Sequence, residues 1–147
     1  MKKFLILLFF ICVSCGYKPI YTMNDQLNSK FKKIILNGDK KINRQIINSV
    51  DLEENTSSDL ELLITTNYRI EETSKNTKGQ IATYRSIIET QLVIKKEKTI
   101  FKQENFSNEF SYNNKDNKYE LIKYQNEIKN NLINELINEI ILFLKLR

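Results

Sequence analysis

Residues 60–71, LELLITTNYRIE, decide the fold because their side chains alternate between two chemical characters. One set consists of Leu60, Leu62, Ile64, Thr66, Tyr68 and Ile70, while the positions between them carry mostly charged or polar residues such as Arg69 and Glu71. Successive side chains of a β-strand point to opposite faces, so the pattern predicts a strand with one buried and one solvated face.

Two further segments continue the alternation. Residues 81–96 place on one face Ala82, Tyr84, Ser86, Ile88, Thr90, Leu92 and Ile94. Residues 99–112 form the next strand, in which the apolar face changes between Phe101 and Phe106, and this change predicts a β-bulge or a shift of register. The polar loop of residues 72–80 contains Gly79 and joins the first two strands. Three successive strands with short polar connections predict an antiparallel meander.

Helical periodicity appears on both sides of these strands. Residues 119–144 repeat apolar side chains every three or four positions and contain no Gly or Pro, which predicts a long helix. Residues 39–52 show the same repeat from Ile42 to Val50, and Asp39 is the expected N-cap of this second helix. Residues 31–37 read as a short first strand closed by Gly38. The order β-α-β-β-β-α predicts an α+β two-layer sandwich, with a mostly antiparallel four-stranded sheet and two helices on one face, as a single domain over residues 31–147.

The N-terminus resembles a bacterial lipoprotein signal. Lys2 and Lys3 precede an apolar run over residues 4–13, which at about 1.5 Å per residue is too short to cross the ~30 Å core of a bilayer. Residues 13–16, VSCG, resemble a lipobox, which implies cleavage between Ser14 and Cys15 and attachment of lipid, including an acyl chain such as palmitate, to Cys15. Residues 1–14 are then the signal peptide, and residues 15–30 a lipidated tether.

Two neighbouring residues qualify this interpretation. Cys12 stands where a lipobox usually has Leu, so an ordinary secretory signal with a free thiol at Cys15, or an uncleaved anchor, remain alternatives. Gly16 follows the lipidated position where Asp would retain a lipoprotein in the inner membrane, and Gly16 therefore indicates the outer membrane. The expected location is the cell outer membrane, on its periplasmic side or within a barrel lumen.

Composition restricts the chemistry of the domain. The chain has no His, and its only cysteines are Cys12 and Cys15, so the processed chain offers no disulfide, thiol nucleophile or Cys/His zinc site. Gly occurs only at positions 16, 38 and 79, which excludes a phosphate-binding Gly-rich loop, and no GxSxG or SxxK motif is present. The formal charge of +5 includes no basic cluster interleaved with aromatics. We therefore expect no enzyme, metal, cofactor or nucleic-acid partner.

The start CGYKPIY, residues 15–21, followed by this element order, resembles the alphaproteobacterial form of the LPS-assembly lipoprotein family LptE. The segment KGQIATYR, residues 78–85, is also similar to that family. The resemblance implies an outer-membrane lipoprotein that partners and plugs the β-barrel LptD and helps to deliver lipopolysaccharide to the outer leaflet. Phosphate groups of lipopolysaccharide require cationic donors.

The candidate lipopolysaccharide contacts are Arg69, Lys75, Lys78 and Arg85, which are expected to gather at one end of the sheet as a cationic tip. Glu71 and Glu72 lie beside them, so an ordinary solvated hairpin end is the alternative interpretation. For the whole protein, the alternatives are another lipoprotein that supports envelope assembly, for example of β-barrels, or a carrier of lipid. The bulky Leu, Ile and Tyr of the inward face argue against the cavity that a carrier needs.

Overall fold

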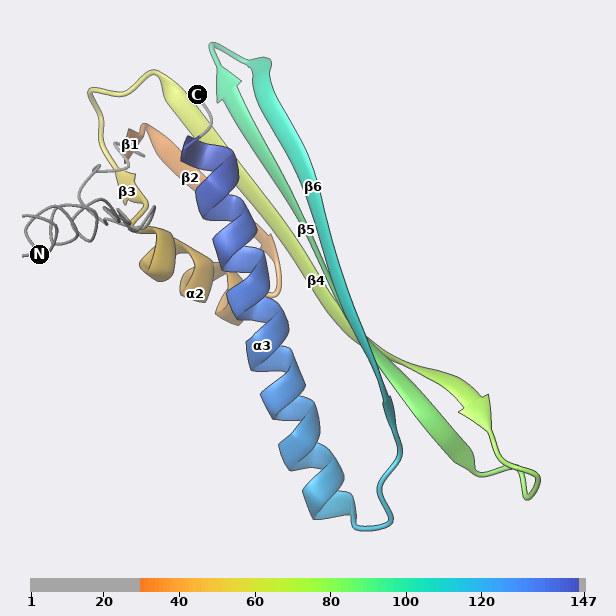
Figure 1. Ribbon diagram of the computed structural model, residues 1–147. Helices are drawn as coiled ribbons and strands as arrows, with labels where there is room; N and C mark the ends of the chain where they lie inside the picture. Colours follow the sequence, from red (N-terminus) through yellow and green to blue (C-terminus); the bar gives the residue numbers. More distant parts are fainter. Residues whose placement is uncertain (1–29, 146–147) are drawn as a thin grey trace, which may run out of the picture.

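The computed structural model describes residues 30–145, and its centre is a four-stranded sheet with two helices on one face (Figure 1). The expectations for the signal peptide, the tether up to residue 29, Ser14 and Cys15 lie outside the described residues. The sheet has the strand order β2-β4-β5-β6, with β2 parallel to β4 and the other neighbours antiparallel. The elements of the sandwich are β2 (Lys33–Gly38), α2 (Lys40–Val50), β4 (Leu60–Lys75), β5 (Ile81–Lys96), β6 (Thr99–Asn113) and α3 (Lys118–Lys145).

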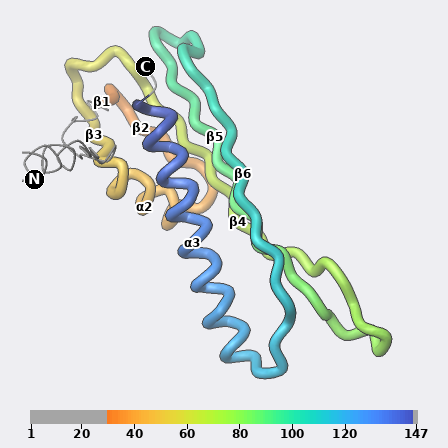
Figure 2. Tube along the Cα trace, viewed as in Figure 1, coloured from red at the N-terminus to blue at the C-terminus, as the bar shows by residue number. Residues whose placement is uncertain are grey.

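This architecture confirms the α+β fold and the element order expected from the sequence. The first strand is interrupted, because β1 (Lys30–Phe31) pairs with β3 (Glu53–Glu54) in a separate two-stranded parallel sheet before β2 begins. Phe31, at the end of β1, is only 1% exposed and belongs to the core. Figure 2 shows β2 and α2 at one end of the main sheet, while α3 runs along much of its length.

The turn from β2 into α2 is built by three consecutive residues. Asn37 accepts a hydrogen bond from the side-chain amide of Asn43, and Gly38 adopts a left-handed φ of 76°. Asp39 is the N-cap, as expected, because its carboxylate accepts from the backbone N–H groups of Lys41 and Ile42. A Cβ atom at Gly38 would collide with the backbone carbonyl of Thr66, so only glycine permits this approach.

The predicted bulge in β6 is present at Phe101. Ile94 pairs with Lys102 and Lys95 pairs with Ile100, which leaves Phe101 without a partner on β5. Phe101 is 62% exposed, whereas Phe106 is 8% exposed and packs in the core. Because of the bulge, Ile100 lies opposite Lys95 on the face away from the helices, whereas Lys102 lies opposite Ile94 on the helix side.

The core lies between the sheet and the helices. The strands contribute inward residues such as Leu62, Ile64, Ile88 and Leu92, and α3 contributes the stripe Ile128, Leu132, Leu136 and Ile140, each at most 5% exposed. Some residues that the periodicity assigned to buried faces are exposed. Ile122 is 57% exposed, and Ile70 is 40% exposed because it lies where β4 runs toward the projecting end of the hairpin.

No helix within residues 30–145 covers the opposite face of the sheet, which we call the open face and which carries the odd-numbered residues of β4 and β5 (Figure 1). The paired residues Ile35, Leu63 and Val93 form an apolar row across it. Farther along the strands, the open face carries charged side chains from β4, β5 and β6, and these include two of the predicted site residues.

Candidate functional site

The β4–β5 hairpin projects beyond the end of β6, and its tip carries Lys75 and Lys78 (Figure 1). The turn is fixed by Asn76, whose side-chain oxygen accepts from the backbone N–H groups of Lys78 at 2.9 Å and Gln80 at 3.0 Å. Gly79 supplies a φ of 79°. No ion pair formed by residues 30–145 includes either lysine, so the tip presents two cations that are not neutralised by neighbouring carboxylates.

The stem of the projecting hairpin is held by hydroxyl groups. Thr83 lies 2.6 Å from the hydroxyl of Thr73 and 2.7 Å from that of Ser74, measured between the side-chain oxygens. The pairing shifts register here, between Glu72 and Lys75. An isolated two-stranded ribbon is marginally stable in water, so these cross-strand bonds help to keep the tip ordered.

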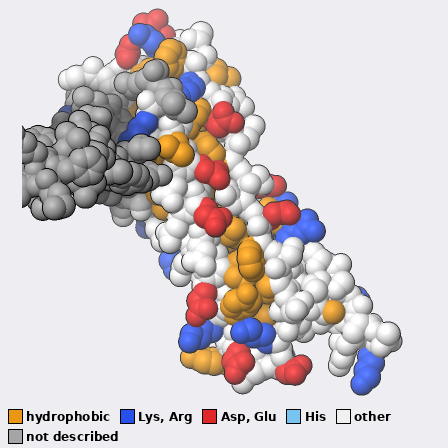
Figure 3. All heavy atoms as spheres, viewed as in Figure 1, with side chains coloured by type: hydrophobic (Ala, Val, Ile, Leu, Met, Phe, Trp, Pro, Cys, Tyr) orange, Lys and Arg blue, Asp and Glu red, His pale blue; other side chains and the backbone are white. Residues whose placement is uncertain are grey.

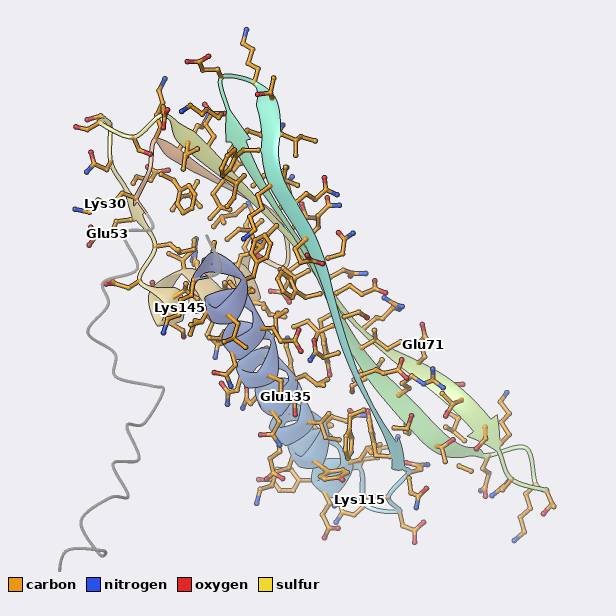
Figure 4. The ribbon with its side chains drawn as sticks, turned by 45° about the horizontal axis from the view of Figure 1, so that its top comes forward. Lys30, Glu53, Glu71, Lys115, Glu135 and Lys145 are labelled. Carbon is orange, nitrogen blue, oxygen red and sulfur yellow. The ribbon has the colours of Figure 1, made fainter. Side chains whose placement is uncertain are left out.

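Arg69 lies on the open face and is bound by two carboxylates. Its Nε is 2.8 Å from Glu71, and its two terminal nitrogens reach the carboxylate oxygens of Glu89 at 2.6 and 3.1 Å. This bidentate contact raises the pKa of Arg69 and lowers the pKa of Glu89. Arg69 is therefore a neutralised member of a cross-strand network. Figure 4 shows Glu71 on the side of the sheet away from α3.

Arg85 also lies on the open face, directly opposite Glu71 in the β4–β5 register. One of its terminal nitrogens is 3.4 Å from Glu109 of β6, a long ion pair. Its Nε is shielded from solvent and has no hydrogen-bond partner. Arg85 is therefore less completely paired than Arg69, although both contact carboxylates.

The structure does not bring the four candidate residues into one cluster. Arg69 precedes Lys75 by six positions on the same strand, which at about 3.3 Å per residue is roughly 20 Å. Lys75 and Lys78 form the cationic tip, whereas Arg69 and Arg85 belong to a charge network with Glu71, Glu89 and Glu109. Only the two lysines have the unpaired positive charge that binding of an anion requires.

A polar and aromatic cluster on the helix side of the sheet was not singled out from the sequence. The Ser86 hydroxyl lies 3.1 Å from the Tyr68 hydroxyl and 3.3 Å from that of Tyr112. Burial raises the pKa of Tyr68, which its hydrogen bond to Ser86 opposes. The sequence did place these polar residues on the predicted inward faces, among apolar ones. It could not show that their hydroxyl groups meet, because that contact depends on strand register.

Beside this cluster, the end of β6 and α3 border a cleft of about 560 Å³. Its lining includes Phe110, Tyr112 and Tyr124, and the ammonium of Lys115 lies 4.4 Å from the centre of the Tyr124 ring. Tyr112 contacts Tyr124 edge to face, with ring centres 5.7 Å apart. Figure 3 shows apolar side chains gathered in a strip between α3 and β6, in the lower half of the view.

The described residues contain no cluster of three or more His, Cys, Asp or Glu side chains that could hold a metal ion. No helix within residues 30–145 combines the length and hydropathy needed to cross a membrane. The arrangement offers instead a projecting cationic hairpin, a charge-paired open face and an apolar strip at the β6 edge. These are surfaces suited to contact with other molecules.

The fold defined by these elements is that of several solved bacterial lipoproteins. No protein-family model and no curated protein sequence matches this chain. A putative lipoprotein from Caulobacter crescentus is similar with a TM-score of 0.54 and 14% identity, covering 80% of this chain and 89% of that one. Lipoprotein B from Nitrosomonas europaea is similar with a TM-score of 0.55 and 7% identity, covering 77% of this chain and 83% of that one.

A minor lipoprotein from Acinetobacter baumannii is also similar, with a TM-score of 0.52 and 11% identity, covering 76% of this chain and 88% of that one. The likeness extends over most of each chain. At such low identity, what the three proteins share with this chain is the fold.

Proposed function

We propose that this chain is an outer-membrane lipoprotein of the lipopolysaccharide transport machinery, which acts as the plug and partner of the β-barrel LptD and helps to deliver lipopolysaccharide to the outer leaflet. The observation that carries the proposal is the likeness of the two-layer domain to solved structures that are lipoproteins. It agrees with the lipobox-like residues 13–16 and with the resemblance of residues 15–21 to the LptE family.

The surface of the domain is consistent with a position inside a barrel. The lumen of an outer-membrane barrel is polar, and beyond the apolar row of Ile35, Leu63 and Val93 the open face presents paired charges and amides. In this proposal Cys15 holds the lipid that anchors the chain, and the domain works by binding, without catalysis.

Within this function, Lys75 and Lys78 are the proposed contacts for phosphate groups of lipopolysaccharide. Both stand at the end of a projecting hairpin whose turn is fixed by Asn76, and neither is neutralised by a carboxylate of residues 30–145. Arg69 and Arg85 are assigned a secondary role, because their contacts with Glu89 and Glu109 must weaken before they can bind another anion.

The test of partnership is purification of the lipidated full chain from outer membranes, followed by mass spectrometry of the proteins bound to it. Recovery of LptD in stoichiometric amount supports the proposal, and recovery of a β-barrel assembly protein in its place contradicts it. A Cys15→Ser variant is the control, since it removes the proposed lipid attachment and should abolish fractionation with the outer membrane.

The test of lipopolysaccharide contact compares two double variants with the same change of charge. Lys75→Glu with Lys78→Glu alters the hairpin tip, whereas Lys95→Glu with Lys98→Glu alters the opposite end of β5 and the following turn. We expect the first pair to reduce lipopolysaccharide binding at least tenfold and the second to change it less than twofold. Equal effects of both pairs would show that only net charge matters.

A further inference from the structure

β6 is the last strand of the sheet, and among the described residues no other strand pairs with its outer edge. The strand is 15 residues long, well above the usual five or six. An edge strand presents unpaired backbone N–H and C=O groups that can bind another strand. The long edge of β6 is therefore the largest set of unpaired backbone groups on the main sheet.

The residues whose backbone faces outward can be identified from the ladder. The backbone N–H of Asn114 donates to the carbonyl of Ala82 at 2.8 Å, so these two residues form a hydrogen-bonded antiparallel pair. The bonding direction alternates along a strand, and even-numbered residues of β6 therefore bond to β5. The residues that direct N–H and C=O groups away from β5 are Gln103, Asn105, Ser107, Glu109, Ser111 and Asn113, all of them exposed.

This part of the edge lacks the devices that usually prevent strand addition. Such devices include proline, bulges and short length. β6 contains no proline, and its bulge lies at Phe101, before the regular pairing that extends from Lys102 to Asn113. The 11 residues from Gln103 to Asn113 are regular enough to accept a complete additional strand.

An apolar strip accompanies the edge on the side of α3, as Figure 3 shows. Phe106 packs edge to face on Phe143, Tyr112 packs on Tyr124, and Phe110 remains 47% exposed in the wall of the cleft. Alternate side chains of an added strand would point toward this strip. The edge thus offers both main-chain bonds and apolar contacts, the two components of peptide recognition by strand addition.

The charge along the edge indicates the kind of segment that fits. Between Gln103 and Asn113 the only charged residues are Glu104 and Glu109. Glu139 of α3 accepts a hydrogen bond from Asn108, and Glu135 lies one turn earlier on the same helix side, near the middle of α3 in Figure 4. Three carboxylates, those of Glu104, Glu109 and Glu139, therefore border the edge. Glu109 is already paired with Arg85, whereas Glu104 and Glu139 form no ion pair within residues 30–145, and these two favour a basic segment and disfavour a second copy of β6.

We infer that the β6 edge from Gln103 to Asn113 is a strand-addition site, which takes an extended segment containing Lys or Arg from a partner protein. Only the identity of the partner rests on the proposed function, which makes the barrel protein the first candidate. The backbone of the segment bonds to the odd-numbered residues of β6, its apolar side chains cover Phe110, and its basic side chains meet Glu104 and Glu139.

The test uses the lipidated full chain in its membrane, with a photo-crosslinking residue at Ser111 and, as a control, at Thr65 on the central strand β4. Ser107→Pro removes one outward N–H and leaves the bonds to β5 intact, whereas Ser107→Ala keeps that N–H. We expect crosslinking from Ser111 to one basic, extended peptide, reduced at least tenfold by Ser107→Pro and less than twofold by Ser107→Ala. Circular dichroism of the purified variants checks their folding.

A second variant covers the case in which Ser107→Pro does not fold. Glu104→Lys reverses a charge at the edge, and Glu97→Lys makes the same change in the distant β5–β6 turn. Only Glu104→Lys should weaken the crosslink, by about fivefold or more. Absence of a crosslink at Ser111, a crosslink to a second copy, or a crosslink insensitive to these variants overturns the inference. The identity of a captured peptide tests the barrel partnership separately.

Discussion

The hydroxyl groups of Thr66 and Thr90 lie 2.9 Å apart in the buried layer between the sheet and the helices, where they join β4 to β5. Thr66 has no solvent exposure, and Thr90 is only 2% exposed. Each hydroxyl therefore depends on the other as a side-chain partner in a region where water does not compete. This pair also lies beside the turn into α2, because the carbonyl of Thr66 accepts from the backbone N–H of Asp39 at 2.8 Å.

Removal of one hydroxyl of this pair should cost more than removal of both. Thr66→Val or Thr90→Val leaves a buried hydroxyl without its partner, and we expect a loss of about 1–3 kcal/mol in the free energy of unfolding. The double variant replaces both groups with a similar shape and should lose less than the sum of the single variants. Chemical denaturation of the four proteins measures the coupling, and strict additivity would contradict it.

Gly38 and Gly79 both have positive φ angles, yet alanine should affect them differently. At Gly38, the added Cβ meets the backbone carbonyl of Thr66, and we expect Gly38→Ala to lower the free energy of unfolding by about 3 kcal/mol or more. At Gly79 nothing lies within 4 Å, so only the backbone strain of about 1–2 kcal/mol remains. Thermal unfolding of both variants provides the comparison, and equal losses would show that the collision at Gly38 relaxes.

The elements that the sequence predicted best are those whose residues repeat with one period and end at a clear signal. β5 occupies residues 81–96 as expected, since its alternation continues without interruption and polar turns bound it on both sides. The cap at Asp39 was also predictable, because it depends on neighbouring residues alone. The parallel pairing of β2 with β4 was not specified by periodicity, because that pattern says nothing about which strands become neighbours.

The candidate site shows the same limit more sharply. Lys75 and Lys78 were both predicted in the loop of residues 72–80, but β4 continues to Lys75, so Lys75 ends a strand and only Lys78 lies in the turn. The partners of Arg69 and Arg85 were not predicted, because Glu89 and Glu109 lie 20 and 24 residues away in the sequence. Their contacts follow from the register of three strands, and a shift by one residue would place them on the other face.

The ion pair between Arg69 and Glu89 should contribute an acid-sensitive part of the stability. The hydrogen bond from Arg69 to the Glu89 carboxylate lowers the pKa of Glu89 in the folded state below the reference value of 4.5. The contribution is therefore fully present above about pH 4.5 and is lost as the pH falls through the lower, folded-state pKa. The stability of Glu89→Gln should fall less steeply than that of the wild type below pH 4.5, as measured by urea denaturation at several pH values.

A suitable control for this titration is Glu104→Gln, because no ion pair of residues 30–145 involves Glu104. Its acid dependence should follow that of the wild type. The difference between wild type and Glu89→Gln should also shrink in 0.5 M salt, since both side chains of the pair are substantially exposed and ions screen them. A difference that is independent of salt would assign the effect to packing.

Phe101 and Phe106 lie five residues apart in β6, and their side chains occupy opposite environments. Phe106 is 8% exposed and contacts the ring of Phe143, so Phe106→Ala should remove about 3–5 kcal/mol from the free energy of unfolding. Phe101→Ala should change it by less than about 0.5 kcal/mol, because that side chain is 62% exposed. Urea denaturation of both variants measures the difference, and equal losses would contradict the environments assigned to the two side chains. Lys102→Ala completes the comparison: its ammonium donates to the carbonyl of Phe143 and lies over the ring of that residue, so its loss should lower stability and weaken the end of α3.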